Sequence, residues 1–388
     1  MNLDALAVVP LAFYLALAVL AAWGALMALR GDFWRADQRL VEGELQPERW
    51  PAVAVIVPAR NEADVVEQSL STLVAQHYEG DVSVFLVDDR SEDDTATLAR
   101  SVDGVTVVGG HDAPAGWTGK MWAVSQGIDA MEVANFPAEY VWLTDADIAH
   151  HPGELASLIA GSEHGGLDLN SLMVRLRIER LWDVLLIPAF VFFFQKLYPF
   201  PWVNDPARKT AAAAGGSMLV RRSALARIGG IAPIAGELID DCALAQRIKS
   251  SGGRIRLSLA TETHSIRAYR SIGEIWRMAA RTAFHQLNYS IPALSGTVTA
   301  MAFLYLLPPV LTVVGLVMGE IPTVAAAFAA WFAMGWAFAP TLYRYGLSPY
   351  YGFTLPLAGF LYTLMTLDSA CRHWQGRGGE WKGRTHRP

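Results

Sequence analysis

The sequence predicts a doubly wound, Rossmann-like α/β domain with transmembrane helices on both sides. Short β-prone runs alternate with helical runs between residues 50 and 150, which is the βαβ pattern of a largely parallel sheet. Uncharged apolar runs lie near the N-terminus and after residue 290. The composition agrees, because 53% of the 388 residues are hydrophobic, 18% are charged and the mean hydropathy is +0.26, which favours membrane segments.

Charge and cysteine content exclude some classes of protein. The net charge of −6 gives no basic surface for DNA or RNA, so we expect no nucleic-acid partner. The two cysteines, Cys242 and Cys371, lack metal-binding spacing and suit a reducing compartment. The nine histidines show no H-E-x-x-H spacing, so a zinc site is not expected.

Residues 1–30 are predicted to form an N-terminal transmembrane helix. The run from Ala5 to Leu29 carries no charge and is long enough to cross a bilayer. A cleavable signal peptide is the alternative, but no basic residue precedes the run and the run is too long for a signal core. The arginines after it place the N-terminus outside and the next domain in the cytoplasm. The polar residues 31–50, with two tryptophans, are predicted to be a linker at the membrane interface.

The predicted α/β domain spans residues 51–290. Its strands are expected at residues 53–57, 82–87, 105–108 and 140–143, and its helices at 63–76, 95–100 and 121–131. The loop after the first strand lacks the G-x-G-x-x-G pattern, which argues against a dinucleotide cofactor.

Acidic residues follow two of these strands. Asp88 and Asp89 end the second strand, and Asp145 and Asp147 follow the fourth. Ligands of open α/β sheets bind at the carboxyl ends of strands, and two carboxylates one residue apart suit Mg²⁺ or Mn²⁺. The alternatives are an Asx-rich turn for Asp145 and Asp147, and a helix N-cap for Asp88 and Asp89.

Two further motifs stand before predicted helices. Lys120 ends the run Gly116–Lys120, whose glycines and lysine suit a phosphate contact, although the spacing is not that of a P-loop. Asp240 and Asp241 open a helical stretch that reaches residue 249. Carboxylates at that place stabilise the helix dipole, or they serve as a general base.

Taken together, these motifs resemble the family 2 glycosyltransferases, inverting enzymes with the GT-A fold. The matching runs are V-P-A-R-N-E (57–62), V-D-D-R-S (87–91), G-W-T-G-K (116–120), D-A-D (145–147), G-G-S-M-L-V-R-R (215–222) and I-D-D-C-A-L-A-Q-R (239–247). A basic motif around residues 277–281 and the tail 381–384 complete the set, so the resemblance covers roughly residues 50–290 plus the tail. Within the family, the chain is most similar to the membrane enzymes associated with hopanoid biosynthesis, and ceramide and carotenoid glycosyltransferases are more distant.

The resemblance implies a nucleotide-sugar-binding domain, with a UDP-sugar as the expected donor. It assigns Asp88 and Asp89 to the uracil and ribose, in a pocket that Pro58, Arg60 and Glu62 would also line. It implies that Asp145 faces the sugar, that Asp147 ligates Mg²⁺ or Mn²⁺ at the diphosphate, and that Lys120 assists electrostatically.

The same resemblance assigns the proton-transfer and tail residues. Asp241 falls at the position of the general base, and Asp240 stands where relatives usually carry Glu. Arg281 matches the family's basic motif, but Thr282 replaces its Trp, which leaves open how the acceptor entrance is shaped. Arg277 lies one helical turn before Arg281, so either it helps to hold the diphosphate or it faces lipid headgroups. In the tail, Trp381 and Arg384 are expected to meet the active site.

The remaining apolar runs predict membrane contact. Residues 181–203 contain Pro188, and we read them as an interfacial segment, with a buried core helix as the alternative. The membrane region 291–370 holds runs at 291–318, 321–342 and 350–367. Three crossings would put the tail, 371–388, outside, but its basic residues favour the cytoplasm. The last run, which is the shortest and contains Pro356, is therefore expected to be re-entrant or interfacial.

The predicted function is metal-dependent transfer of a sugar from a nucleotide diphosphate to a membrane lipid hydroxyl, on the cytoplasmic side of a bacterial inner membrane. A role in hopanoid biosynthesis rests on the resemblance alone. Two alternatives stay open, a polyisoprenyl-phosphate glycosyltransferase and a non-catalytic membrane scaffold built on the GT-A fold. A transporter is disfavoured, because the apolar runs carry few polar residues to form a path.

Overall fold

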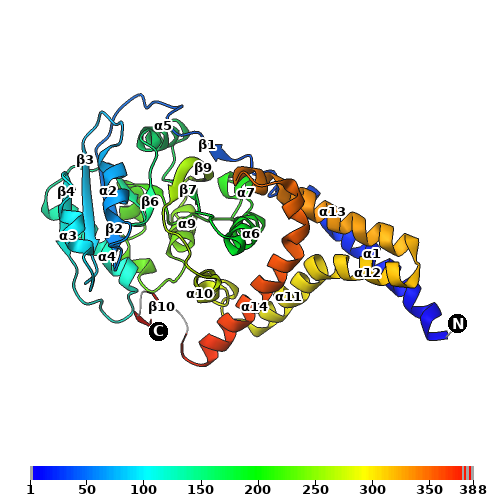
Figure 1. Cartoon of the computed structure of the whole chain (residues 1–388). Coiled ribbons are helices and arrows are strands. Elements are labelled where there is room, and N and C mark those ends of the chain that lie inside the picture. Colours follow the sequence, from blue (N-terminus) through cyan, green and yellow to red (C-terminus); the bar gives the residue numbers. More distant parts are fainter. Residues whose placement is uncertain (1–2, 378–379, 382–383, 386–388) are drawn as a thin grey trace. The chain divides into compact units, whose positions relative to one another are not determined.

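The computed structural model describes residues 3–377, 380–381 and 384–385, with side chains from residue 11 to residue 377. The chain divides into two compact units (Figure 1). The helical unit comprises Met1–Ala36, Ile178–Pro199 and Tyr269–Gly378, and the sheet unit comprises Asp37–Arg177, Phe200–Ala268 and Gly379–Pro388.

The sheet unit is built on one mixed sheet. In its described residues the strand order is β1-β9-β7-β8-β5-β2-β3-β4, and β6 pairs with β9. The strands are β1 (Arg39–Leu40), β2 (Val53–Ala59), β3 (Val82–Asp88), β4 (Val105–Gly109), β5 (Tyr140–Leu143), β6 (Ile148–Ala149), β7 (Leu169–Arg175), β8 (Met218–Arg221) and β9 (Ile255–Ser265). Strands β5, β2, β3 and β4 are parallel neighbours, as the sequence predicts, whereas β8 runs antiparallel to both β5 and β7.

Helices cover both faces of the parallel half of the sheet. The helices of this unit are α2 (Val66–Val74), α3 (Thr95–Arg100), α4 (Gly119–Val133), α5 (Glu154–Gly165), α7 (Phe200–Asn204), α8 (Arg222–Arg227), the short η1 (Ala232–Ile234) and α9 (Asp240–Ser250). Val55 of β2 belongs to the same buried cluster as Leu70 of α2 and Leu158 of α5. Its neighbour Ile56 points to the opposite face, because side chains alternate along a strand. There α4 packs so closely that a methyl carbon on Gly127 would lie 2.5 Å from Ile56 Cγ2.

Part of the segment predicted as an interfacial linker, 31–50, belongs to the sheet unit. Arg39 and Leu40 form β1, which pairs with β9 in parallel. Two residues later, the Glu42 carboxylate accepts a hydrogen bond from the backbone N–H of Thr261 at 2.9 Å. This segment therefore extends the sheet at its edge.

The helical unit contains three helical stretches that are long and apolar enough to cross a membrane. Among the described residues they are Leu11–Leu29, Ile291–Met318 and Ile321–Arg344. The elements of this unit are α1 (Leu3–Leu29), α6 (Leu181–Leu197), α10 (Ile272–Thr282), η2 (His285–Leu287), α11 (Ile291–Met301), the π-helical η3 (Ala302–Leu306), α12 (Leu307–Met318), α13 (Ile321–Arg344), η4 (Pro349–Thr354) and α14 (Leu355–Trp374). The run predicted to be re-entrant, 350–367, falls in η4 and α14 and is not among the three candidate spans.

Small side chains allow the candidate spans to pack closely. Ala12 and Ala16 of α1 form a buried cluster with Leu311 of α12 and with Ala326 and Ala327 of α13. Small residues let helix backbones approach each other in an apolar medium, where packing replaces the hydrophobic effect as the driving force. Helix α6 continues through its internal Pro188, and about half of its side chains are buried, which favours the packed-helix alternative for residues 181–197.

In one candidate span, a tryptophan side chain donates a hydrogen bond to a backbone carbonyl that has no backbone donor. The carbonyl of Leu304 would accept from residue 308 in an α-helix or from residue 309 in a π-helix, but both are prolines and have no N–H. The buried Trp23 of α1 donates its indole N–H to Leu304 O at 2.9 Å instead. An apolar environment offers no water to satisfy that carbonyl, so this bond ties α1 to η3.

Trp23→Phe is expected to lower the free energy of unfolding by about 1–3 kcal/mol, because it leaves the half-buried Leu304 carbonyl without a donor. Thermal unfolding in nanodiscs measures the effect. Pro308→Ala restores a backbone N–H to the helix, so Trp23→Phe should cost less in that background. Equal losses in the two backgrounds would show that the indole contributes only by packing.

Candidate active site

The reversed direction of β8 creates the site. Leu143 at the end of β5 pairs with Met218 at the start of β8, so the chain that enters β8 meets the chain that leaves β5. The Thr144 hydroxyl, just after β5, donates to the carbonyl oxygen of Gly216 at 2.8 Å. The D-A-D and G-G-S motifs, far apart in the sequence, therefore form one corner of the sheet.

Three of the predicted site residues surround a single point above Gly215. A methyl carbon built on this glycine would lie 3.2 Å from Lys120 Nζ, 3.6 Å from Asp241 Oδ2 and 3.8 Å from Asp145 Oδ2. Lys120 comes from the first turn of α4, Asp241 from the first turn of α9, and Asp145 from the turn after β5. The absence of a side chain at Gly215 leaves this space open between the three charged groups.

Lys120 holds two carboxylates by ion pairs. Its Nζ lies 2.9 Å from Asp145 Oδ1 and 3.2 Å from Asp240 Oδ2. Burial alone would lower the pKa of Lys120, but the charges of Asp145, Asp240 and Asp241 outweigh it and raise the pKa above its usual value. The lysine is therefore positively charged at neutral pH and provides a fixed cation beside the carboxylates.

Asp241 is half-buried and is held by backbone donors. Its Oδ2 accepts from the N–H of Gly215 at 2.9 Å, and its Oδ1 accepts from the N–H of Cys242 at 2.7 Å. Burial and the neighbouring charge of Asp240 raise the pKa of Asp241 to about 6, although Lys120 opposes the shift. A carboxylate with this pKa is ionised at pH 7 and is a stronger base than an ordinary aspartate, which suits general-base chemistry.

Asp147 is paired with an arginine that the sequence analysis does not single out. Its Oδ2 accepts from Arg267 Nε at 2.9 Å and from Ser265 Oγ at 3.2 Å. Arg267 also donates to the Glu62 carboxylate, so it joins the loop after β2 to the loop after β5. Burial would lower the pKa of Arg267, but Asp147 and Glu62 raise it above its usual value. Arg267 follows β9 with no motif around it, so no sequence signal identifies it.

The carboxylates of the D-A-D motif fit a divalent cation that takes few ligands from the protein. Within the described part of the chain, Asp145 Oδ2 and Asp147 Oδ1 take part in no hydrogen bond or ion pair. No group of three or more His, Cys, Asp or Glu side chains gathers among those residues. A hard cation here would therefore complete its shell with oxygens from a ligand, as Mg²⁺ and Mn²⁺ do with phosphates.

The residues predicted for the nucleotide lie at the ends of β2 and β3. The Arg60 guanidinium donates to the backbone oxygen of the buried Asp89 at 2.6 Å and lies 3.9 Å from its Oδ2. Asp88 Oδ1 accepts from the N–H of Ser91 at 3.2 Å and stabilises the turn after β3. The alternative of a helix N-cap is wrong, because the N-cap of α3 is Asp94. Pro58 is buried within β2.

The other predicted site residues belong to different parts of the chain. Arg277 and Arg281 lie on α10 in the helical unit. Trp381 and Arg384 form paired positions of a short antiparallel ladder, β10 (Glu380–Trp381) with β11 (Arg384–Thr385), and their side chains lie outside the described residues. Neither pair is therefore assigned to the cluster around Gly215.

A cavity at the other edge of the sheet is separate from these groups. It has a volume of about 420 Å³ and is lined by residues of β1, β9 and the loops beside them, among them Arg39, Arg254 and Arg256. None of the carboxylates around Gly215 lines it. The predicted residues Lys120, Asp145 and Asp241 therefore gather at the β5–β8 corner and not in this cavity.

Known proteins share this fold and its sequence pattern. The sequence profile described as "Glycosyltransferase like family 2" matches residues 51–286, which is more than half of the chain. The mannosyltransferase PcManGT from Pyrobaculum calidifontis, solved in complex with GDP-Man and Mn²⁺, aligns over 92% of this chain and 99% of its own, with 22% identity and a TM-score of 0.54. The glucosyl-3-phosphoglycerate synthase of Mycobacterium tuberculosis aligns over 61% of this chain and 79% of its own, with 19% identity and a TM-score of 0.40. No curated protein matches the chain.

The structural likeness to PcManGT confirms the predicted GT-A, Rossmann-like sheet, and the candidate spans confirm the predicted membrane helices before and after it. The profile match extends across the strands and loops that carry Asp89, Lys120, Asp145 and Asp241. The chain belongs to glycosyltransferase family 2 and is a glycosyltransferase.

Proposed function

We propose that this enzyme transfers a sugar, with inversion, from a nucleotide diphosphate to a hydroxyl group of a membrane lipid. The observation that carries the proposal is the meeting of Lys120, Asp145 and Asp241 around the open space at Gly215. One cation, one sugar-facing carboxylate and one basic carboxylate are the groups that a direct displacement at an anomeric carbon requires.

In the proposed reaction, Asp241 accepts the proton of the lipid hydroxyl. The hydroxyl oxygen then forms a bond to the anomeric carbon as the bond from that carbon to the diphosphate oxygen breaks. The electron pair leaves with the nucleoside diphosphate, and the single displacement inverts the anomeric centre. Asp145 orients the sugar, and the Lys120 ammonium, 2.9 Å from Asp145, stabilises negative charge on the departing group.

Asp147, together with Asp145, would hold Mg²⁺ or Mn²⁺. When bound, such an ion neutralises charge on the departing diphosphate. Arg267 donates to Asp147 Oδ2 at 2.9 Å and so holds this carboxylate in place. PcManGT, which has the same fold, was solved with GDP-Man and Mn²⁺, and this supports a nucleotide-sugar donor and a divalent cation here. A UDP-sugar is the donor that we propose, with Asp89 and Arg60 at the nucleoside.

The candidate spans support a membrane location with the sheet unit in the cytoplasm. Arg30, Arg35 and Arg39 follow the first span, and such residues favour the cytoplasmic side. Two further spans, Ile291–Met318 and Ile321–Arg344, would return the chain to that side. The basic tail then lies in the cytoplasm, which removes the conflict of a three-span count. We propose the bacterial inner membrane as the location and a hopanoid-type lipid as one candidate acceptor, on the resemblance alone.

The decisive test is transfer by the purified enzyme in nanodiscs. UDP- and GDP-sugars are supplied with Mn²⁺ and with lipids from a strain that lacks the gene, and the products are analysed by mass spectrometry. We expect one lipid to gain the mass of one sugar through an acid-stable link. A sugar attached through an acid-labile phosphate would favour the polyisoprenyl-phosphate alternative. No transfer and no nucleotide release from any donor would favour the non-catalytic scaffold.

Lys120→Gln is expected to shift the pH profile of the enzyme. Lys120 is the cation that opposes the raised pKa of Asp241, so its removal should raise that pKa above about 6. Because the base acts only when it is deprotonated, the fall in kcat on the acid side should move to higher pH. The pH dependence of kcat measures this, with the exposed Lys209→Gln as the control. An unchanged acid limb would contradict the assignment of Asp241 as the titrating base.

A further inference from the structure

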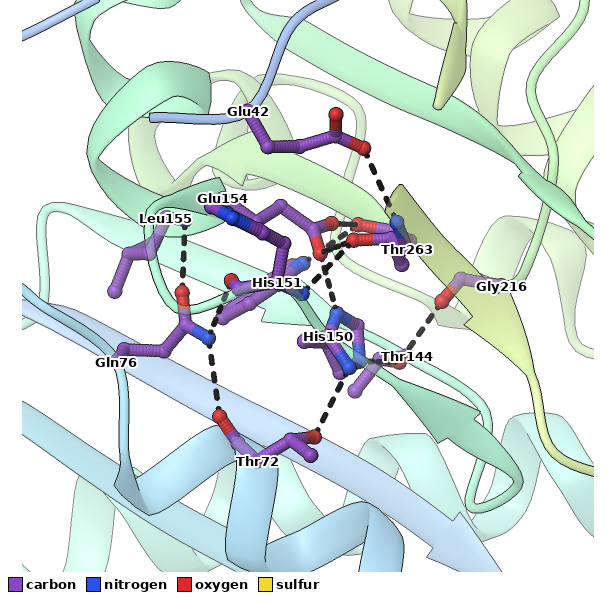
Figure 2. A network of polar contacts seen from close by, with 12 residues as sticks. Glu42, Thr72, Gln76, Thr144, His150, His151, Glu154, Leu155, Gly216 and Thr263 are labelled. Carbon is purple, nitrogen blue, oxygen red and sulfur yellow. Dashed lines mark hydrogen bonds and ion pairs between the residues drawn. The ribbon is translucent and has the colours of Figure 1, made fainter. Parts of the chain in front are cut away.

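A histidine–glutamate pair lies completely buried behind the corner where β5 and β8 meet (Figure 2). His150 follows β6, Glu154 opens α5, and His150 Nδ1 lies 2.7 Å from Glu154 Oε2 with both side chains inaccessible to solvent. The ring of His150 packs edge-on against Trp142 of β5, with 4.7 Å between the ring centroids. Neither residue touches the point above Gly215, so the proposed reaction leaves this costly burial unexplained.

The contacts of the Thr144 hydroxyl determine whether Nε2 of His150 must carry a proton. The Thr144 hydroxyl lies 2.8 Å from the carbonyl oxygen of Gly216 and 2.9 Å from His150 Nε2. A carbonyl oxygen only accepts, and a hydroxyl has one proton, so Thr144 donates to Gly216. The contact with His150 is then a hydrogen bond only if Nε2 carries a proton.

The contacts of the Glu154 carboxylate determine whether Nδ1 of His150 must carry a proton. Ser217 Oγ lies 2.6 Å from Glu154 Oε1 and accepts from the Trp142 indole N–H, and Thr263 Oγ1 lies 2.6 Å from Oε2 and accepts from a backbone N–H. Both hydroxyls therefore direct their protons at Glu154. A carboxylate that receives two hydroxyl donors is stabilised in its ionised form, so His150 Nδ1 must supply the third proton.

The electrostatics of Glu154 agree with an ionised carboxylate. Burial alone would raise the pKa of Glu154, but His150 and the hydroxyls of Ser217 and Thr263 lower it below its usual value. The other carboxylate near this network, Glu42, accepts from the backbone N–H of Thr263 and not from the imidazole. The remaining contacts in Figure 2 around His150, such as its backbone N–H to Thr72 Oγ1 at 3.0 Å, are uncharged.

We infer that His150 is an imidazolium, that Glu154 is its ionised partner, and that this buried ion pair positions the active site. Its hydrogen bonds reach three segments that carry site residues. The first segment contains Thr144, which immediately precedes Asp145. The second contains Gly216 and Ser217, which follow the glycine that donates to Asp241. The third contains Thr263, two residues before the Ser265 that contacts Asp147.

The charge of His150 is essential to this arrangement. A neutral imidazole has one N–H and can donate either to Thr144 or to Glu154, but not to both. Loss of the first bond would release the turn after β5, and loss of the second would leave a buried carboxylate without its cation. The ion pair thus fixes the spacing between the carboxylates of the D-A-D motif and the proposed base, and His150 and Glu154 are positioning residues.

The protonation state can be measured directly. The full chain, labelled with ¹⁵N-histidine, is reconstituted in nanodiscs, and His150→Gln identifies the His150 signals among those of the nine histidines. We expect both ring nitrogens of His150 to carry protons at neutral pH, because each of them lies at a hydrogen-bond acceptor. A neutral His150 at about pH 7 would overturn the proposal, whether or not the enzyme transfers sugar.

The positioning role rests on the proposed function and is tested at Thr144. Thr144→Val keeps the shape but removes the hydroxyl, and Thr144→Ser keeps the hydroxyl. We expect Val to lower kcat at least about ten-fold with little change in the KM for the donor, and Ser to restore most of kcat. His164→Gln, an exposed change on the same helix α5, is the control. Equal effects of Val and Ser, or a change in thermal stability alone, would contradict positioning. If the wild-type chain transfers no sugar, the proposed function fails, while the NMR result still decides the ion pair.

Discussion

Asp241→Asn is expected to abolish sugar transfer, lowering kcat by roughly 10²–10⁴-fold, while nucleotide binding is retained. The amide cannot accept the proton of the lipid hydroxyl. Asp241 has a pKa of about 6, so wild-type kcat should rise with pH through about 6 and then level off. The residual rate of Asp241→Asn should not show this rise, because the titrating group is absent.

Steady-state kinetics and calorimetry with the nucleotide measure these two effects. Both carboxylate oxygens of Asp241 accept backbone N–H groups, and an asparagine can satisfy only one of them, so the thermal stability of the variant must be measured as well. Asp129→Asn, at an exposed position of α4, is the matched control and should behave as wild type. Unchanged turnover by Asp241→Asn would refute the assignment of the base.

Asp147→Ala is expected to remove the metal dependence of nucleotide binding and to abolish transfer. The variant loses the carboxylate that Arg267 holds in place and that would bind the cation. Interaction with a divalent cation stabilises developing charge by several kcal/mol, so the rate should fall by roughly 10³-fold or more. Calorimetry of UDP binding with and without Mn²⁺ measures the first effect.

Metal removal gives an independent test with the wild-type enzyme. A chelator should stop transfer, and an excess of Mn²⁺ or Mg²⁺ should restore it, whereas neither treatment should change the binding of UDP to Asp147→Ala. Asp129→Ala serves as the control for the loss of a carboxylate. Equal UDP affinity of the wild type with and without the ion would count against a metal at Asp145 and Asp147.

The parallel half of the sheet could be predicted from the sequence, and the other half could not. Strands β2, β3 and β5 are largely buried apolar runs that end at turn residues, and β4 is a short β-branched run that is half-buried or exposed, so their positions are clear. Beyond residue 150 the strands no longer stand out as apolar runs between turn residues. Strand β7 has Asn170 in its buried interior, bonded to the Leu158 carbonyl of α5, and β9 contains exposed Arg256 and Glu262. Such strands depend on partners distant in sequence, and a local pattern does not reveal them.

The site was predictable in part for the same reason. Carboxylates after strands mark the ligand-binding edge of an α/β sheet, so Asp89, Asp145 and Asp147 could be singled out. The role of Gly215 depends on the antiparallel pairing of β8 with β5, and that of Arg267 on the path of the chain after β9. Gly215 stands in the run that matches the family, but that run does not reveal the pairing of β8 with β5. Arg267 lies outside every matching run. The buried ion pair of His150 and Glu154 likewise follows only from three-dimensional contacts.

The antiparallel pairing of β7 with β8 has a consequence for how such enzymes diversify. Neighbouring antiparallel strands need only a tight hairpin between them, yet residues 176–217 join β7 to β8 and include the stretch Ile178–Pro199 that belongs to the helical unit. The two ends of this excursion are anchored by the register of Ser171 with Met218. A change in the length of this excursion would therefore leave the register of β7 and β8 unchanged, so related enzymes can differ there while they keep the same sheet.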